Sequence, residues 1–390
     1  MRPSMLSIAC AIALLTALPC PSPACILCGQ VRVTQTLREE ANYPSARLIL
    51  YGTLGKARLF SDAPGKGETD FHIEAVLRAD PQLAPESRKR KGDVLVLPHY
   101  LPPQKPGMPT RSLVFCDVVG GRFDLYRGVE VASPAAADYL AGVLALDLRD
   151  SRHSLLYFFR FLDHPDKVVA QDAYMEFVKA SDREVADAGR YLSATKLRAW
   201  IRDPNTPAER LGLFAFLLGS CGSKEDVAWF ESALANPSGR TAEAYDGILS
   251  GYIRLRPKEG WTLAVKLLRE GRATLPIRLS AIRTLRFYQA WIPRESRTGL
   301  LAALGAVLQQ GELVDLAVEE LRRGEMWDLT EAVLALYGRK GLDAPIQRRA
   351  IVRYALSCPL PRAKAFVGEL RKREAELVSE VEETLQPAQR

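Results

Sequence analysis

The chain has 390 residues, which is too long for one compact core and predicts two or more structural units. Hydrophobic residues make up 47% and charged residues 25%, the proportions of a folded globular protein rather than a disordered one. The formal net charge of +7 is spread thinly along the chain instead of being concentrated in one stripe, so we predict no nucleic-acid partner.

The first residues are typical of an export signal. Arg2 precedes the apolar run Met5–Leu18, which is too short to span a bilayer. Prolines and small residues follow and suit cleavage before Cys25, so residues 1–24 are predicted to be a signal peptide. The alternatives are an uncleaved anchor and a lipoprotein that begins at Cys25. We therefore expect an exported protein, whether periplasmic, envelope-associated or secreted, with no transmembrane segment after signal cleavage.

Residues 25–130 are predicted to form a small β-rich domain. Short apolar runs with strand-like patterns are separated by turns rich in Gly and Pro. A short helix over 36–41 is expected before the first strand, and Gly120-Gly121 is expected to form a hairpin turn. Such a series of short strands suggests a small barrel or a sandwich. The predicted strands are 47–54, 69–77, 93–97 and 112–118.

Residues 131–380 are predicted to be helical, and residues 381–390 to be a disordered tail. Helix-period apolar runs follow one another, joined by short turns, and small residues recur in mid-helix roughly 32 to 42 residues apart. This spacing favours an α-solenoid of helix pairs in which each small residue lets a neighbouring helix approach, although a non-repetitive helical domain is the alternative. The predicted fold class is therefore α+β. The recurring small residues are Ala173, Ala215, Gly247, Ala281, Ala317 and Ala350.

Three segments of the helical part resemble HEAT repeats: Asp166–Ala173, Pro276–Arg283 and Pro345–Arg353. The whole arrangement is similar to a family of uncharacterised exported bacterial proteins that combine a signal, a Cys-x-x-Cys at the mature start, a β-rich domain and HEAT-like helices. This resemblance implies an architecture and no known activity. The matching pieces outside the helices are Cys25–Cys28, Tyr51–Leu54, Thr69–Phe71, Leu113–Val118 and Tyr126–Gly128.

The β-rich domain more distantly resembles the netrin/TIMP-like OB folds, which start with a cysteine and contain a strand like Phe71–Leu77. The resemblance implies an OB-like barrel. The start here is Cys-x-x-Cys rather than the Cys-x-Cys of TIMP inhibitors, in which the mature amine and cysteine carbonyl chelate zinc.

An oxidising compartment makes disulfides possible, and Cys25, Cys28 and Cys116 are the candidates. A free or metal-binding Cys25/Cys28 pair is the alternative, but no fourth ligand has metal-site spacing, so we predict no metal site. Cys221 and Cys358 lie in predicted helices and are expected to be buried, inert thiols.

No pattern in the sequence indicates a catalytic centre or a cofactor site. The four His residues are scattered, and neither a G-x-S-x-G elbow nor a Gly-rich phosphate loop occurs. We therefore predict a non-catalytic binding scaffold for a protein or an envelope polymer. An inhibitor or enzyme-accessory module acting through the cysteine-led β domain is the alternative. Arginines recurring on equivalent helices are the predicted binding residues, with salt bridging between repeats as the other interpretation: Arg278, Arg283, Arg348 and Arg353.

Overall fold

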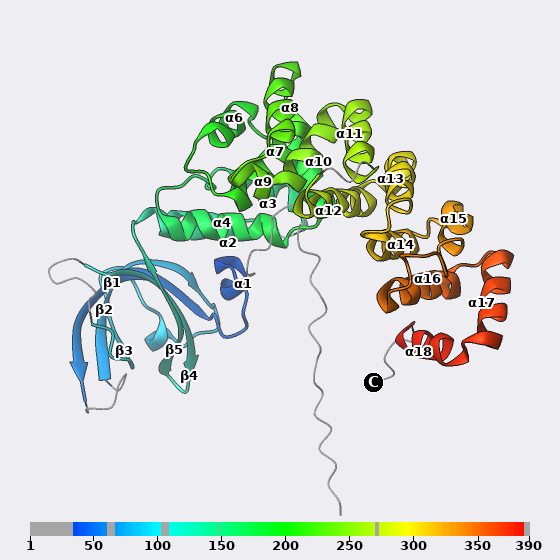
Figure 1. Cartoon of the computed structure of the whole chain (residues 1–390). Helices are drawn as coiled ribbons and strands as arrows, with labels where there is room; N and C mark the ends of the chain where they lie inside the picture. The colour runs from blue at the N-terminus through cyan, green and yellow to red at the C-terminus, as the bar shows by residue number, and fades with distance from the viewer. Residues whose placement is uncertain (1–33, 61–66, 103–108, 148, 270–272, 386–390) are drawn as a thin grey trace, which may run out of the picture.

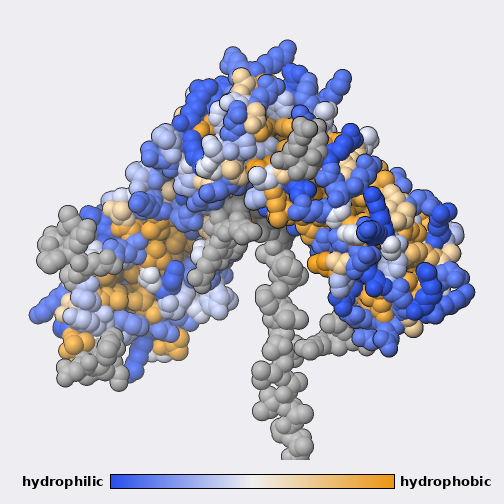
Figure 2. All heavy atoms as spheres, in the orientation of Figure 1, coloured by the Kyte–Doolittle hydropathy of each residue, from blue (hydrophilic) through white to orange (hydrophobic). Residues whose placement is uncertain are grey.

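The structure is a computed structural model that describes residues 34–60, 67–102, 109–147, 149–269 and 273–385. It is α+β, with a small antiparallel sheet at the N-terminal end and a long succession of helices after it (Figure 1). The helices form an arch, with the sheet at one foot and the last helices at the other. Figure 2 shows mainly hydrophilic side chains on the helices in this view, and hydrophobic ones gathered over the sheet.

The sheet has five strands in the order β3-β2-β1-β4-β5, and every neighbouring pair is antiparallel. Each strand that the apolar runs predicted is present. The β4–β5 connection is the predicted hairpin, in which Gly120 and Gly121 have φ values of 57° and 77°, as a tight two-residue turn requires. The strands are β1 (Leu48–Leu59), β2 (Gly67–Ala79), β3 (Val94–Leu97), β4 (Arg111–Val119) and β5 (Arg122–Val131), with a 3-10 turn η2 (Pro85–Ser87) before β3.

The two faces of the sheet are both apolar, and each packs into a different core. Along β1, Leu48 and Leu50 join a cluster with residues of the other strands, such as Phe71. The intervening residues Ile49 and Tyr51 point to the other face and join the core of the helices. The sheet and the first helices therefore share one continuous apolar core.

A short helix, α1 (Leu37–Ala41), confirms the predicted helix before the first strand. Thr36 accepts a hydrogen bond from the Glu39 backbone N–H, and the Glu39 carboxylate accepts one from the Thr36 backbone N–H, which forms a capping box. One of its buried residues, Leu37, belongs to the helical core. This helix therefore stays folded despite its length because its neighbours hold it in place.

The remaining chain is helical and consistent with a helical repeat region. In Figure 1, α12, α14, α16 and α18 follow the inner side of the arch, and α11, α13, α15 and α17 follow the outer side. The described part of the helical region also contains the 3-10 turns η3 (Lys224–Asp226) and η4 (Trp327–Leu329). The helices are α2 (Ala135–Leu144), α3 (Ser151–Phe159), α4 (Lys167–Lys179), α5 (Asp182–Gly189), α6 (Ala194–Arg202), α7 (Ala208–Cys221), α8 (Val227–Ala235), α9 (Arg240–Glu243), α10 (Tyr245–Leu255), α11 (Pro257–Arg269), α12 (Leu275–Trp291), α13 (Pro293–Val307), α14 (Val314–Arg323), α15 (Thr330–Leu334), α16 (Pro345–Ser357), α17 (Pro361–Arg373) and α18 (Ala375–Leu385).

The recurring small residues lie one on each of α4, α7, α10, α12, α14 and α16, and all are buried. One of them, Gly247, lies where α7 and α10 pack closely. A Cβ atom added to Gly247 would lie 2.3 Å from the Gly212 carbonyl oxygen, and one added to Gly251 would lie 2.4 Å from the Ala215 carbonyl oxygen. At these positions the two backbones touch, so only glycine fits.

The helical region extends further than the sequence pattern predicted. Residues 381–385, expected to begin a disordered tail, are the last turn of α18. Val381 is buried in an apolar cluster with Val378, Val352 and Leu370, which holds this turn against α16 and α17. Residues 386–390 lie outside the described residues, as does the predicted signal peptide.

Candidate functional site

A concavity lies where the sheet meets the helices, and we call it the junction pocket. Its volume is 790 Å³. Its walls come from Thr34, Gln35 and α1, from β5, from the turn before α4, from α4 and α6, and from α7 with the loop before it. A concave site with an apolar floor and a few polar groups is the usual form of a binding pocket.

An aromatic group forms part of the apolar floor of the junction pocket. The Trp200 ring lies 4.8 Å from the Phe214 ring and 5.0 Å from the Phe159 ring, measured between centroids. Its indole Nε1–H donates to Asp163 Oδ2 at 3.0 Å. With both ring contacts and its only donor engaged, Trp200 is held in one orientation and offers a rigid apolar wall.

The polar rim of the pocket carries charges of both signs. Arg210 is fixed by donating to the Leu162 carbonyl oxygen at 2.8 Å and to Gln171 Oε1 at 3.1 Å. Burial lowers the pKa of the Arg210 guanidinium, although this group remains a cation at neutral pH. Lys167, one turn before Gln171 on α4, is exposed and has no ion pair in the described part of the chain.

In the lining of the pocket, Asp172 of α4 is joined to α1 and to α2 through its two carboxylate oxygens. Oδ1 accepts from the backbone N–H of Leu37 at 2.7 Å, and Oδ2 accepts from the Tyr139 hydroxyl at 2.6 Å. Burial raises the pKa of Asp172 to about 7, although both hydrogen bonds act in the opposite direction. One turn later, Glu176 pairs with Arg38 of α1 at 2.5 Å. Because donors of the protein occupy both oxygens, we assign Asp172 to anchoring α1 rather than to acid–base chemistry.

The four arginines predicted to be binding residues lie on α12 and α16. Each forms an ion pair with a carboxylate of a different helix or of a loop between helices. Their guanidinium groups are thus engaged in contacts that join successive elements of the stack. The pairs are Arg278–Glu312, Arg283–Asp246 (2.5 Å), Arg348–Glu374 and Arg353–Glu319 (3.9 Å).

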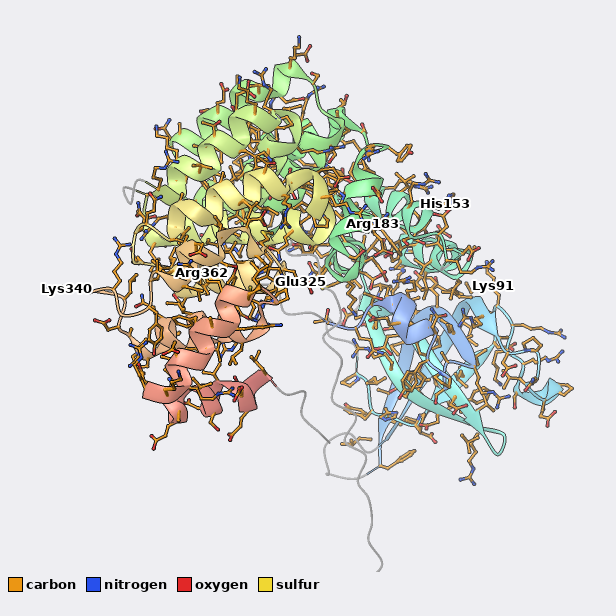
Figure 3. All side chains as sticks on the ribbon, turned by 90° about the vertical axis from the view of Figure 1, so that its right-hand side faces the viewer. Lys91, His153, Arg183, Glu325, Lys340 and Arg362 are labelled. Atoms are coloured by element: carbon orange, nitrogen blue, oxygen red, sulfur yellow. The ribbon has the colours of Figure 1, made fainter. Side chains whose placement is uncertain are left out.

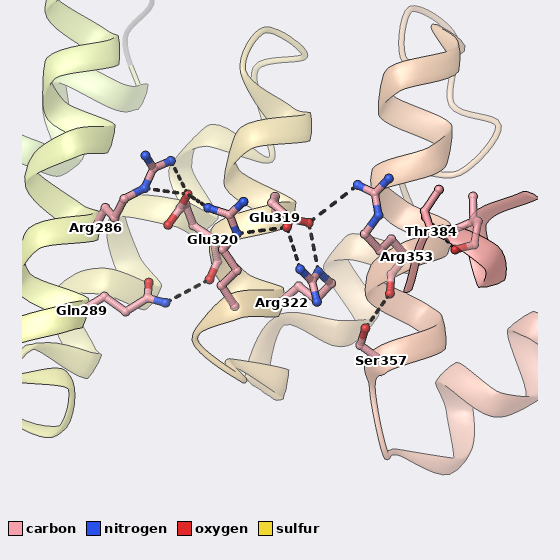
Figure 4. Close-up of polar contacts among 10 residues, drawn as sticks. Arg286, Gln289, Glu319, Glu320, Arg322, Arg353, Ser357 and Thr384 are labelled. Atoms are coloured by element: carbon pink, nitrogen blue, oxygen red, sulfur yellow. Dashed lines mark hydrogen bonds and ion pairs between the residues drawn. The ribbon is translucent and has the colours of Figure 1, made fainter. Parts of the chain in front are cut away.

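Two adjacent carboxylates of α14, Glu319 and Glu320, interact with arginines of α12 and α16 (Figure 4). Glu320 is buried and accepts from Arg286 of α12 at 2.5 Å. Glu319 accepts from Arg322 at 2.7 Å and lies 3.9 Å from Arg353 of α16. Burial acts to raise the pKa of Glu319, but the hydrogen bond and charge of Arg322 outweigh it, so the pKa is lowered. The carboxylates of α14 therefore link three successive inner helices.

Glu320→Gln should lower the free energy of unfolding by about 2 kcal/mol, because a charge-assisted hydrogen bond is lost and Arg286 loses its partner. Urea denaturation of both proteins measures the difference. Glu325→Gln is the matched control, since Glu325 is exposed (Figure 3) and has no ion pair among the described residues, so its effect should stay within about 0.5 kcal/mol. Equal losses in both variants would contradict a structural role for Glu320.

The cysteines of the described residues are all unpaired. Cys116 is fully buried among apolar side chains on the sheet face opposite α1, and burial raises the pKa of its thiol to about 12. Cys358 is buried as expected, whereas Cys221 is only partly buried, and burial raises its pKa to about 11. Cys25 and Cys28 lie outside the described residues, so a bond from either to Cys116 stays a prediction.

Within the ranges that the structure describes, no group of three or more His, Cys, Asp and Glu residues is placed to hold a metal ion. No helix in those ranges is long and apolar enough to cross a membrane. No protein-family model, curated protein or solved structure matches the chain.

Sequence reasoning did not find the junction pocket. Its lining extends from Thr34 to Phe214, and each element contributes only a few residues. No local spacing links such positions. The local sequence feature nearest the pocket is the turn at His164–Asp166, because His164 is part of the lining. In this turn Asp166 caps α4 by accepting a hydrogen bond from the Val168 N–H at 3.0 Å, and it also accepts one from the Ala132 N–H at 2.9 Å.

Proposed function

We propose that this protein is an exported, non-catalytic binding scaffold and that its ligand occupies the junction pocket. The observation that carries the proposal is the pocket itself, whose wall combines residues from the sheet, α1 and the first repeat helices. A ligand seated there contacts both structural units at once. The arginines on the inner side are a weaker candidate, because each already has a carboxylate partner.

The chemistry of the junction pocket suits a segment of a protein or envelope polymer that carries an apolar group beside a charged or hydrogen-bonding one. The Trp200 and Phe214 rings provide the apolar contact. Lys167 and Arg210 provide cations, and Asp203 provides a carboxylate at the rim. Ordered aromatic and arginine side chains are the residue types that contribute most to protein interfaces.

The proposal includes two finer statements about architecture. We propose that the sheet closes into an OB-like barrel between β3 and β5. Support comes from the cluster around Leu50 and Phe71, which includes Leu95 and Leu97 of β3 and has Phe123 and Leu125 of β5 packed against it. We also propose that the helix pairs are HEAT-like repeats, supported by the buried small residue on each of the helices named above.

The proposed function is tested by measuring how much partner the protein captures when substitutions block the junction pocket. Lys167→Glu combined with Gln171→Trp places a reversed charge and a large ring at the rim, and should reduce recovery of the captured partner about tenfold. Envelope extract is passed over the immobilised protein and the recovered partner is quantified by mass spectrometry, with circular dichroism confirming the fold.

Lys224→Glu combined with Gln82→Trp is the matched control, since both residues are exposed and outside the pocket. It should capture as the parent does. If the pocket variant captures as well as the control, the ligand does not occupy the junction pocket. If Arg283→Glu with Arg353→Glu removes capture instead, the inner side of the arch is the binding surface.

A further inference from the structure

A second concave surface lies between outer helices, and we call it the outer groove. Two hollows of 700 and 410 Å³ adjoin, sharing Arg269 of α11 and Ala302 of α13 in their linings. The first lies between α11 and α13, and the second continues over α13 towards the segment from Leu329 to Arg339. The outer groove thus crosses three successive outer elements.

Small side chains make the floor of the outer groove. The short side chain of Ala302 leaves space on α13. The Trp261 ring packs directly on Gly299, where an added Cβ would lie 2.3 Å from a ring carbon, and so forms part of the floor. Val265 lies one turn further along α11, and Leu336 lines the other hollow. This floor is apolar and has room for inserted side chains.

The rim of the outer groove is cationic. Lys258, Lys266 and Arg269 lie on one face of α11, at intervals of eight and three residues, and Arg339 lies at the other hollow. All four side chains are exposed, and none has an ion pair among the described residues. Among the described residues that line the two hollows, Glu295 is the one acidic residue. The arginines on the inner side, in contrast to these four cations, each have a carboxylate partner.

We propose that the outer groove docks an acidic amphipathic helix of a partner protein. An apolar floor selects the apolar face of a helix, and unpaired cations along one rim select glutamate or aspartate beside that face. The apolar floor distinguishes this surface from one built for a nucleic acid, which favours phosphate contacts and stacked bases. The chain's own acidic helix α18 buries Val378 and Val381 within its own fold, so it is not free to fill the groove of a second copy.

The outer groove and the junction pocket have no residue in common, so either proposal can fail alone. The probe is a fluorescein-labelled amphipathic peptide of about five helical turns, with leucine on one face and glutamate on the other. Fluorescence anisotropy with the full chain should show saturable binding that weakens as salt is added. The same peptide with lysine in place of glutamate should bind at least about tenfold more weakly.

Lys266→Glu combined with Arg269→Glu should weaken binding of the glutamate peptide about tenfold or more. The control is Lys340→Glu combined with Lys364→Glu, which makes the same change in net charge at exposed residues outside the groove, and Lys340 projects from the outer edge in Figure 3. It should bind within about twofold of the parent. Ala302→Trp, which fills the floor, should abolish binding without changing net charge.

Equal binding of the two peptides, or equal loss in the groove and control variants, would overturn the proposal. A dimer seen by analytical ultracentrifugation that Ala302→Trp dissociates would also overturn it, since the occupant would then be a second copy. Thermal melts of each variant show whether a loss comes from unfolding. If Ala302→Trp unfolds, the charge variants and the salt dependence decide the question.

Discussion

Gly247→Ala should destabilise the protein by about 2 to 3 kcal/mol, although alanine is normally the better helix former. The added methyl group would lie 2.3 Å from the Gly212 carbonyl oxygen, and the atoms that it meets belong to the backbone, which cannot rotate away as a side chain can. The helices α7 and α10 must then separate at a site where neighbouring Gly251 also touches backbone. Chemical denaturation followed by circular dichroism measures the change.

Gly368→Ala gives the opposite result with the same chemical change. Gly368 is exposed within α17, and an added Cβ would meet no atom within 4 Å. Removing a flexible glycine from an exposed helix should stabilise the protein by about 1 kcal/mol. Destabilisation by both substitutions, or by neither, would show that backbone contact does not determine the packing of α7 on α10.

Asp172→Asn should remove a contribution to the free energy of unfolding that depends on pH. This contribution decreases as the pH rises, which is the opposite of the trend in ordinary acid denaturation. Folding raises the pKa of the Asp172 carboxyl to about 7 because the group is buried. The folded state therefore keeps its proton at pH values where the unfolded chain has lost it. The stability associated with this group is greatest below the unfolded pKa of about 4 and declines as pH rises to about 7, by an amount on the order of 4 kcal/mol.

Asparagine keeps the shape of Asp172 and an oxygen that accepts from the Leu37 N–H, but it cannot ionise. The variant should resemble the parent near pH 4.5 and exceed it in free energy of unfolding near pH 7.5. Urea denaturation of both proteins across this range gives the difference directly, and contributions of other carboxylates cancel. Parallel curves for the two proteins would contradict the assignment.

The elements were predictable from sequence because they depend on local periodicity. The alternation in Phe71–Leu77 and the apolar run at the start of β1 predicted two of the strands. The end of α18 was not predictable in this way. The helix continues to Leu385 because Val381 finds a buried place against other helices, which is a tertiary effect.

The candidate site was predicted less well than the fold, for a physical reason. A repeated arginine has the same pattern whether it faces a partner or a carboxylate of the next helix. Only the positions of Asp246 and Glu319 show that Arg283 and Arg353 form ion pairs within the chain. The junction pocket forms because Trp200 and Phe214 lie in one lining with residues of α1 and β5, and the periodicity of the sequence does not predict that arrangement.

The carboxylates of α14 join the inner side of the arch through ion pairs. Arg286 of α12 pairs with Glu320, and Arg353 of α16 lies 3.9 Å from Glu319, so electrostatic attraction links three successive inner helices. Mobile ions screen the half-exposed members of these pairs more than they affect apolar contacts. The link between these inner helices is therefore expected to weaken as ionic strength rises, while the apolar contacts between the same helices change less.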